Sequence, residues 1–451
     1  TENLSDGALL SGSADNVRWE ITNKNASQGT FSLVVRRGDD NHKSKIILES
    51  YQNLSLDPKS TNYIAKVIGD QYRTVGSDGA VTVVGDYPHA SKYVYVSNIN
   101  HKTPDYLTAD GTADSVYTGS FDNFVIGSGS YHGTFAGAAG TLFDSSREAK
   151  FYQNISAVDS QGLDADATTG VNYDSAALTL ANRDEYRFNV LLTPGITKDL
   201  HSSVVTSFVE MVEDRGDAIY VADLVQHGGS VTTVTTQANS MNSSFAAAYW
   251  PWVKIVDNQL GRNVWSPAST VIGGVYAFTD RVGAEWFAPA GLLRGGIPTV
   301  VGAERKLSQS DRDTLYQGKV NPLATFPGSG VVAYGQKTLQ TKASALDRVN
   351  VRRLLINLKN FIGDEANNLV FEQNTIATRN RFLATVNPYL ESVVQRQGLY
   401  AYRVVMDDTN NTSDVIDRNQ LVGQIFIQPT KTAEFIVLDF VVQPTGASFG
   451  A

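Results

Sequence analysis

The chain has 451 residues, enough for two to four domains and a large buried core. Its formal charge of -9 argues against nucleic-acid binding, which needs concentrated Lys and Arg. Because it contains no cysteine and only six histidines, the sequence excludes disulfides, thiolate metal sites and a cysteine nucleophile, and it disfavours metal catalysis.

The N-terminal third has the pattern of a β-rich domain. Two apolar runs, Phe31–Arg36 and Lys45–Glu49, flank a polar segment and predict a β-hairpin. Further strands are expected at Ala80–Val84 and Tyr93–Ser97. From residue 105 to residue 172 the chain is rich in Gly, Ser, Thr and Asp, which predicts variable surface loops followed by a linker.

After the linker the pattern alternates between helices and strands. Asp174–Ala181 is typical of a helix, and Tyr186–Thr193 of a buried strand that Pro194 and Gly195 end. An amphipathic helix over residues 200–216 and a strand over Ala218–Val225 follow. Strand, helix and strand in this order predict parallel pairing through a right-handed crossover.

A Pro- and Gly-rich segment, Phe287–Pro298, opens the last part of the chain. There the spacing of apolar residues predicts a helix over Leu346–Ile362. Strands are expected at Leu399–Met406, Gln420–Gln428 and Glu434–Gln443. The predicted fold class is therefore a multidomain α+β and α/β chain, with a β-rich domain at residues 1–165, an α/β domain at 166–295 and an α+β domain at 296–451.

Short motifs that suggest chemistry fail on their context, so we expect no enzyme, no cofactor and no metal site. Met406–Asp414 (MDDTNNTSD) lacks the ligand spacing of a calcium loop and is typical of a turn. Gly446–Gly450 (GASFG) matches a nucleophile elbow, but only one residue follows it. RGD occurs at Arg37–Asp39, at the predicted hairpin tip, and at Arg215–Asp217, between a helix and a strand; only the first could bind a receptor.

The helix over Leu346–Ile362 carries Arg348, Arg352, Arg353 and Lys359 in an otherwise acidic chain. Two interpretations remain open for this basic group. The first is a solvated helix face. The second is a surface that docks onto an acidic protein, where charge pairs set register and orientation.

Several long motifs, in order, resemble contractile tail sheath proteins of bacteriophages, above all those of large T4-type myophages, and of related injection machines. They are AYWPWVKIVD (248–257), SPASTVIGGVYAFTDRVGAEWFAPAG (266–291), LYQGKVNPL (315–323), VVAYGQKTL (331–339), LDRVNVRRLL (346–355), and residues 402–442 with the PTGASF tail. A further run, ESYQNLSLDPKSTNYIAKVIG (49–69), extends the resemblance toward the N-terminus.

The resemblance implies a structural subunit that polymerises as stacked hexameric rings around a tail tube and contracts to drive the tube through the host envelope. The implied partners are other copies of the chain, the tail tube protein, and baseplate and tail terminator proteins, with no nucleic acid and no direct membrane insertion. The implied location is the tail of the virion, after assembly in the host cytoplasm. In this arrangement residues 1–165 form an outer domain and residues 296–451 an inner core domain.

The resemblance also suggests roles for particular residues. Arg348, Arg352, Arg353 and Lys359 become candidates for tube contact. A C-terminal strand shared between neighbouring subunits falls on consecutive residues, which are Glu434, Phe435, Ile436, Val437, Leu438, Asp439, Phe440 and Val441.

Family chains begin with a segment that includes an exchanged arm, and nothing like it precedes residue 31 here. We therefore expect the chain to be a fragment, monomeric or weakly associating until that segment is restored. The alternative function is a β-rich virion or cell-surface adhesin that uses the Arg37-Gly38-Asp39 loop.

Overall fold

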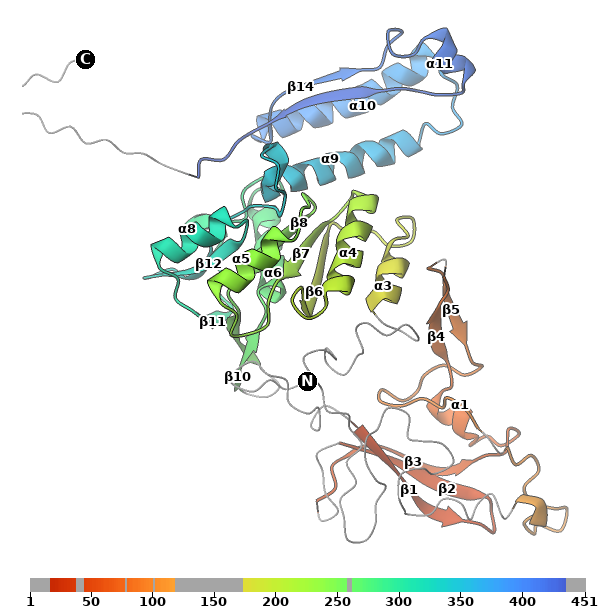
Figure 1. Ribbon diagram of the computed structural model, residues 1–451. Helices are drawn as coiled ribbons and strands as arrows, with labels where there is room; N and C mark the ends of the chain where they lie inside the picture. The colour runs from red at the N-terminus through yellow and green to blue at the C-terminus, as the bar shows by residue number, and fades with distance from the viewer. Residues whose placement is uncertain are drawn as a thin grey trace, which may run out of the picture.

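The computed structural model describes residues 17–37, 44–77, 79–99, 102–117, 173–257 and 262–434. These ranges form a mixed α+β structure with an N-terminal, a central and a C-terminal unit along the chain (Figure 1). None of the helices in these ranges is long and apolar enough to cross a membrane. Within the same ranges, no three His, Asp or Glu side chains gather where they could hold a metal ion.

The N-terminal unit is built on a three-stranded antiparallel meander. Its elements are β1 (Val17–Asn25), β2 (Thr30–Arg37), β3 (Ile47–Ser55), α1 (Ile64–Ile68), and the hairpin of β4 (Tyr72–Val75) and β5 (Val81–Val84). Phe31, Leu33, Leu54 and Ile68 form its core. The predicted hairpin is confirmed as β2–β3.

The prediction of a strand at Tyr93–Ser97 is wrong. The segment is extended, but it pairs with no strand of the described residues. Its Val96 N–H instead donates to the Gly69 carbonyl, 2.9 Å away, just after α1. Apolar alternation cannot distinguish such a segment from a strand, because both have the same period of two.

The central unit is a five-stranded sheet in the order β13-β12-β8-β7-β6. Its strands are β6 (Val190–Thr197), β7 (Ile219–Asp223), β8 (Ala246–Trp250), β12 (Asn321–Phe326) and β13 (Gly330–Ala333). All neighbours pair in parallel except β12 and β13. The parallel pairing of β6 and β7, predicted from the strand–helix–strand order, is confirmed.

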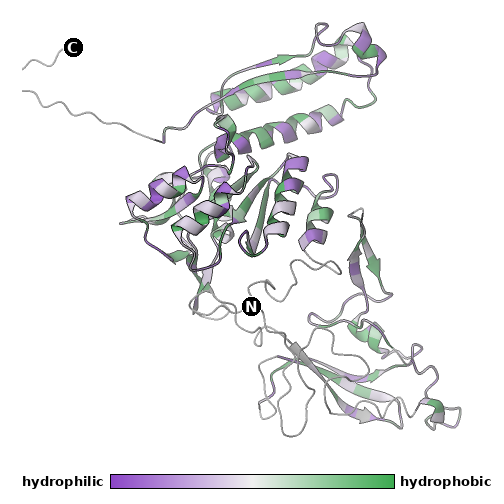
Figure 2. Ribbon diagram, in the orientation of Figure 1, coloured by the Kyte–Doolittle hydropathy of each residue, from purple (hydrophilic) through white to green (hydrophobic). Residues whose placement is uncertain are grey.

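Helices cover both faces of this sheet (Figure 1). One face carries α3 (Tyr173–Leu180), α4 (Ser202–Arg215), α5 (Val231–Asn239) and α8 (Gln309–Gln317); the other carries α6 (Ser269–Val282). Along β7, Tyr220 and Ala222 enter the first core while Ile219 and Val221 enter the second. The strand is therefore apolar on both sides, as a parallel sheet between two helical layers requires. Figure 2 shows the hydrophobic colour along these central strands.

Two predictions about the central unit are corrected. The first concerns the domain boundary between residues 295 and 296: β12 and β13 lie beyond it, yet they belong to the same sheet. The boundary therefore falls after β13. The second concerns β6, which begins at Val190 and continues through Pro194, with a register shift between Leu192 and Thr197. An irregularity of this kind accommodates a residue that cannot donate a ladder hydrogen bond.

A smaller sheet extends from the central unit in the order β10-β9-β11. Its strands are β9 (Val253–Asp257), β10 (Arg262–Ser266) and β11 (Val300–Ala303). A four-residue helix, α7 (Gly291–Arg294), contacts α6 and β13.

The C-terminal unit consists of two long helices covered by a two-stranded sheet. In chain order it contains the 3-10 turn η2 (Ala345–Asp347), α9 (Val349–Asn367), α10 (Ile376–Gln395), β14 (Leu399–Val405), α11 (Ser413–Asp417) and β15 (Gln424–Pro429). The predicted helix and the first two predicted strands are confirmed. The third strand, Glu434–Gln443, lies outside the described residues except for Glu434.

Helix α9 belongs to two hydrophobic cores at once. Val349 and Ile356 pack into the central unit, whereas Leu354 and Leu358 pack against α10. The guanidinium of the buried Arg353 binds both carboxylate oxygens of Asp280 on α6, at 2.9 and 2.6 Å. The central and C-terminal units are therefore joined by the side chains of α9, which pack into both units, rather than by a linker.

A carboxylate is buried where β7 meets α6. Asp223, 3% exposed, accepts hydrogen bonds from the Ser269 amide at 3.1 Å and the Ser269 hydroxyl at 2.5 Å. Burial raises the pKa of Asp223 to about 7, although both hydrogen bonds from Ser269 act in the opposite direction.

Replacing Arg353 by Met is expected to lower the free energy of unfolding by about 3 kcal/mol, because Asp280 loses its partner inside the joint. Urea titration followed by circular dichroism measures the change. The matched control is Arg187→Met, which breaks the exposed pair Arg187–Asp364 at 3.1 Å and should change stability by less than about 1 kcal/mol. Equal effects of the two substitutions would contradict the role of Arg353 in the joint.

The Asp223→Asn variant is expected to gain stability relative to the parent as pH rises. Between the ordinary aspartate pKa of 3.8 and the raised pKa of about 7, the folded protein holds a proton on Asp223 that the unfolded chain releases. The parent therefore loses up to about 1.4 kcal/mol per pH unit over this window and nothing further above it. Urea titrations from pH 4.5 to 8 measure the difference. The exposed Asp184→Asn serves as control, and parallel pH profiles for parent and Asp223→Asn would rule out the effect.

Candidate functional site

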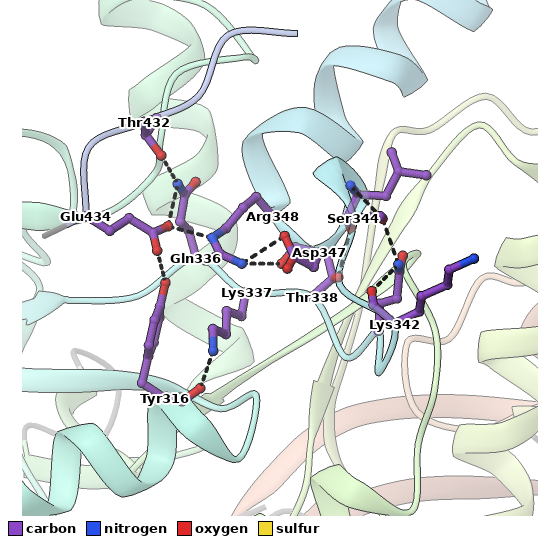
Figure 3. Close-up of polar contacts among 12 residues, drawn as sticks. Tyr316, Gln336, Lys337, Thr338, Lys342, Ser344, Asp347, Arg348, Thr432 and Glu434 are labelled. Carbon is purple, nitrogen blue, oxygen red and sulfur yellow. Dashed lines mark hydrogen bonds and ion pairs between the residues drawn. The ribbon is translucent and has the colours of Figure 1, made fainter. Parts of the chain in front are cut away.

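The candidate site lies where the described chain ends, after β15. Thr430 still bonds to the base of the hairpin, its amide donating to the Gly398 carbonyl at 3.2 Å. Four residues later, Glu434 rests on the central unit beside the start of α9 (Figure 3). The site is therefore the place where the C-terminal segment leaves the body of the protein.

The Glu434 carboxylate accepts hydrogen bonds from three side chains that come from three parts of the chain. Arg348, at the start of α9, donates its Nε to Oε1 at 2.7 Å. Gln336, after β13, donates its Nε2 to the same oxygen at 3.2 Å. The Tyr316 hydroxyl, on α8, donates to Oε2. Because both oxygens are bound and the carboxylate side chain is 17% exposed, the segment is fixed at this residue.

Neighbouring groups hold the three donors in place. Asp347 binds the other end of the Arg348 guanidinium at 2.8 Å. Lys337 donates its Nζ to the Tyr316 carbonyl at 2.8 Å and lies 4.2 Å from the centre of the Tyr316 ring. Gln336, 3% exposed, also binds the Thr432 hydroxyl at 2.7 Å. Arg348 and Tyr316 are thus preorganised by contacts outside the C-terminal segment, whereas Gln336 binds that segment at both Thr432 and Glu434.

The pKa values of the surrounding groups favour this arrangement near neutral pH. Burial and the hydrogen bond to Glu434 raise the pKa of Tyr316 far above its usual value, so its hydroxyl stays a donor. Burial alone would lower the pKa of Arg348, but its hydrogen bond to Glu434 and the nearby acidic groups raise it. Burial lowers the pKa of Lys337, and the charge of Arg348 adds to this effect. The arrangement suits the anchoring of a chain segment rather than a chemical reaction.

The exposed basic face expected on α9 is wrong for two of its four residues. Arg352 and Arg353 are 5% and 2% exposed. Arg352 donates its Nε to the Ser244 carbonyl at 3.2 Å and stacks on Phe245, with its Cζ 3.8 Å from the ring centre. The physical reason is that α9 is covered on both sides, so one flank of its basic group faces the central unit. Arg348 is engaged by Glu434, and Lys359 is exposed.

The turn predicted at Met406–Asp414 is confirmed as an ordered connection between β14 and β15. Asn411, 2% exposed, donates to the Val422 carbonyl at 2.8 Å and accepts from the Val422 amide at 2.9 Å. Asp408 binds Arg379 on α10 at 2.7 Å. The polar side chains of this turn therefore take the place of backbone pairing in a long connection.

The second RGD copy has a structural role. Arg215, 3% exposed, binds both carboxylate oxygens of Asp217 at 2.9 and 2.8 Å and the Tyr186 carbonyl at 2.8 Å. In the first copy, Gly38 and Asp39 lie outside the described residues, as does the GASFG motif.

Nothing in the sequence alone indicates Tyr316, Gln336 or Asp347 as functional residues. Tyr316 and Gln336 lie within the LYQGKVNPL and VVAYGQKTL motifs that supported the resemblance, but their common partner is 118 and 98 residues away. No local pattern indicates such a contact. The available signal was that both residues lie inside motifs that supported the resemblance.

Two family models match consecutive parts of the chain. The phage tail sheath protein central domain matches residues 166–339, and the phage tail sheath C-terminal domain matches residues 341–443. The border between them falls after β13, where the central sheet ends, and before α9.

Curated relatives named tail sheath protein include those of two phages. The protein of Vibrio phage KVP40 is 44% identical over 193 residues, which are 43% of this chain and 29% of the relative. That of Enterobacteria phage T4 is 38% identical over 229 residues, 51% of this chain and 35% of the relative. These matches thus span about a third of the curated relatives' length. Among solved structures, a chain of the anti-feeding prophage baseplate, 6-fold symmetrised, shares the fold, with 22% identity, a TM-score of 0.52, and coverage of 65% of this chain and 76% of that one.

Replacing Arg348 by Met is expected to loosen the segment around Glu434, because the carboxylate then loses its only charged donor among the described residues. A charge-assisted hydrogen bond of this kind corresponds to roughly a tenfold change in local opening. Hydrogen exchange of a peptide covering residues 424–434, read by mass spectrometry, should accelerate about tenfold. The exposed neighbour Lys342→Met is the control, and unchanged exchange in Arg348→Met would contradict the anchor.

Proposed function

The chain belongs to the phage tail sheath family, and on that premise we propose that it is a structural subunit of a contractile sheath. It polymerises as stacked hexameric rings around the tail tube in the virion, after assembly in the host cytoplasm. Contraction of this polymer drives the tube through the host envelope. The observation that carries the proposal is the pair of consecutive family matches, which together run from residue 166 to residue 443.

The joint at α9 supports motion of the central and C-terminal units as one body. A helix shared by two cores cannot be displaced from one of them without exposing apolar residues and separating Arg353 from Asp280. Contraction therefore exchanges contacts between subunits while each subunit keeps its interior. The energy comes from the difference between two sets of contacts, with no enzymatic step.

The two-stranded sheet β14–β15 supports exchange of strands between subunits. Within the described residues, neither strand pairs with a third strand, so each has an edge that can accept another chain. We propose that residues Glu434 to Val441 supply a strand of this shared sheet. Glu434 then marks the border between the part of the chain that belongs to its own subunit and the part that reaches a neighbour.

Tube contact is proposed for the exposed residue Lys359, whereas Arg348, Arg352 and Arg353 are engaged inside the chain. Baseplate and tail terminator proteins are the further proposed partners at the two ends of the polymer. The second RGD copy does not support the adhesin alternative, because Arg215 and Asp217 are buried in an ion pair with each other.

The test is negative-stain electron microscopy of the longest natural form of the chain mixed with its tail tube protein. Striated hollow cylinders are expected. Leu438→Pro should abolish them, because proline removes a donor from the proposed shared strand, while Leu438→Ala should retain them. Dispersed particles from the folded, unsubstituted chain, in the presence of tube and baseplate, would overturn the proposal.

A further inference from the structure

The sheet of β14 and β15 contains one charged residue, Arg403. All other residues of Leu399–Val405 and Gln424–Pro429 are uncharged. The Arg403 side chain is exposed, and it forms no hydrogen bond or ion pair with any described residue. Hydrogen bonds from Thr409 and, to a smaller extent, the charge of Arg403 lower the pKa of Asp407, but the Asp407 carboxylate binds Thr409 rather than the guanidinium. The sheet therefore presents one cation that has no bonded partner in the described part of the chain.

Arg403 lies on the outer face of this sheet. Its neighbours in β14, Tyr402 and Val404, pack with α9 and α10 in the core of the C-terminal unit. Side chains alternate between the two faces of a strand, so the Arg403 side chain points away from these helices. Its cross-strand partner is Phe426, which is 56% exposed. A strand added at the edge of β14 that is unpaired within the described residues would place one side on the helices and the other beside the Arg403 charge.

The residues that follow Glu434 also contain one charged side chain. It belongs to Asp439, which interrupts the apolar run FIVLDFVV at residues 435–442. Four apolar residues alternate with it in that run, and these are Ile436, Leu438, Phe440 and Val442. In an extended strand these four residues form a wholly apolar side, and Asp439 lies on the opposite side. As a strand, the segment thus matches the sheet, with apolar residues for the helices and a carboxylate on the side of Arg403.

The anchor at Glu434 directs this segment away from its own hairpin. The Thr430 amide still donates to the Gly398 carbonyl at the base of the hairpin, whereas Glu434 is bound by Arg348 at the start of α9. Figure 1 shows the chain running away from β14 and β15 between these two points. To pair with β14 of its own subunit, the segment would have to reverse direction directly after the anchor. A second copy can supply the same strand without such a reversal.

We propose that residues Phe435–Val441 of one copy pair with the free edge of β14 in a neighbouring copy, with Asp439 directly opposite Arg403. The inference rests on the proposed function, which includes the shared sheet, and it specifies the edge and the register of that sheet. The edge is that of β14 because β15 contains no charged residue. The two paired segments are also equal in length, at seven residues each.

Two effects select this register. A slip by one residue would turn Asp439 onto the helices and its apolar neighbours to solvent, so the alternation of the segment opposes it. A slip by two residues keeps the faces but places Asp439 opposite Ala401 or Val405. The charge pair separates these registers, because a cross-strand pair of opposite charges is favoured over a carboxylate opposite an apolar side chain. Arg403 and Asp439 are therefore the residues that position the shared strand.

Because the sequence has no cysteine, introduced cysteines report this register without background. Ala401→Cys leaves the charge pair intact and is combined with a second cysteine in the longest natural form of the chain. Asp439 opposite Arg403 places residue 401 beside Val441 if the strands are antiparallel and beside Val437 if they are parallel. Sheaths assembled on tail tubes are oxidised and analysed by denaturing electrophoresis.

Ala401→Cys with either Val441→Cys or Val437→Cys should give a ladder of covalent multimers. The matched controls, Gln443→Cys and Phe435→Cys, are displaced by two residues and should not cross-link with Ala401→Cys. A mixture of the two single variants of the productive pair should give dimers only, since each chain then carries one cysteine.

Reversing the charges tests the pair itself. Arg403→Asp should lower the cross-linked fraction about fivefold, because a repulsion replaces an attraction. Asp439→Arg should do the same, and the two substitutions together should restore the ladder, since the exchanged charges attract again. The control is Arg418→Asp, at an exposed arginine just after α11 whose Nε binds the Asp414 carbonyl at 3.1 Å. It makes the same change of charge in the same unit and should leave the fraction unchanged.

The outcomes separate the two proposals. Multimers that decrease with either reversal and return with both support the register. Sheaths that assemble overturn it, and leave the sheath function standing, if they cross-link only within one chain, if they cross-link equally at the displaced positions, if they do not cross-link, or if they ignore the charges. Failure of the unsubstituted chain to form any polymer on tubes overturns the proposed function and this contact with it.

Discussion

The ion pair of Arg353 and Asp280 lies at the joint on which the rest of the structure depends. Around it, α9 contributes residues to the core of the central unit and to that of the C-terminal unit. A buried guanidinium with a partner that holds both of its ends tolerates little rotation. The β14–β15 hairpin and the anchor of Glu434 both take their positions from this helix, which fixes them relative to the central sheet.

The site at Glu434 also joins elements from different parts of the chain through one charged group. The three donors to the Glu434 carboxylate come from α8, the segment after β13 and the start of α9. The carboxylate can therefore bind all three only while these elements keep their relative positions. Arg348 and Tyr316 have other contacts, with Asp347 and Lys337, that fix them beforehand, which lowers the entropy lost when the segment docks. The packing of the central unit and α9 thus places the donors, and their positions determine where the C-terminal segment binds.

Local periodicity predicted the elements whose burial is simple. The helices α3, α4 and α9, the hairpin β2–β3 and the strands β7, β14 and β15 could be found this way, because one-sided or complete burial leaves a regular pattern. The buried state of Arg352 and Arg353 could not, since charge in a sequence indicates solvent unless a distant partner is known. The sheet that crosses residue 295 and the grouping of Tyr316, Gln336 and Glu434 depend on the same kind of long-range contact.

The position of Glu434 also decides how a mechanical load would travel through the subunit. Tension applied to the chain beyond residue 434 reaches Arg348, Gln336 and Tyr316 first, and passes from them into the central sheet. The ladder between β14 and β15 lies behind this clamp, so its hydrogen bonds are shielded from peeling one at a time. In the proposed shared sheet, a two-stranded hairpin that is weak on its own serves as a template for a neighbour while the body of the subunit carries the force.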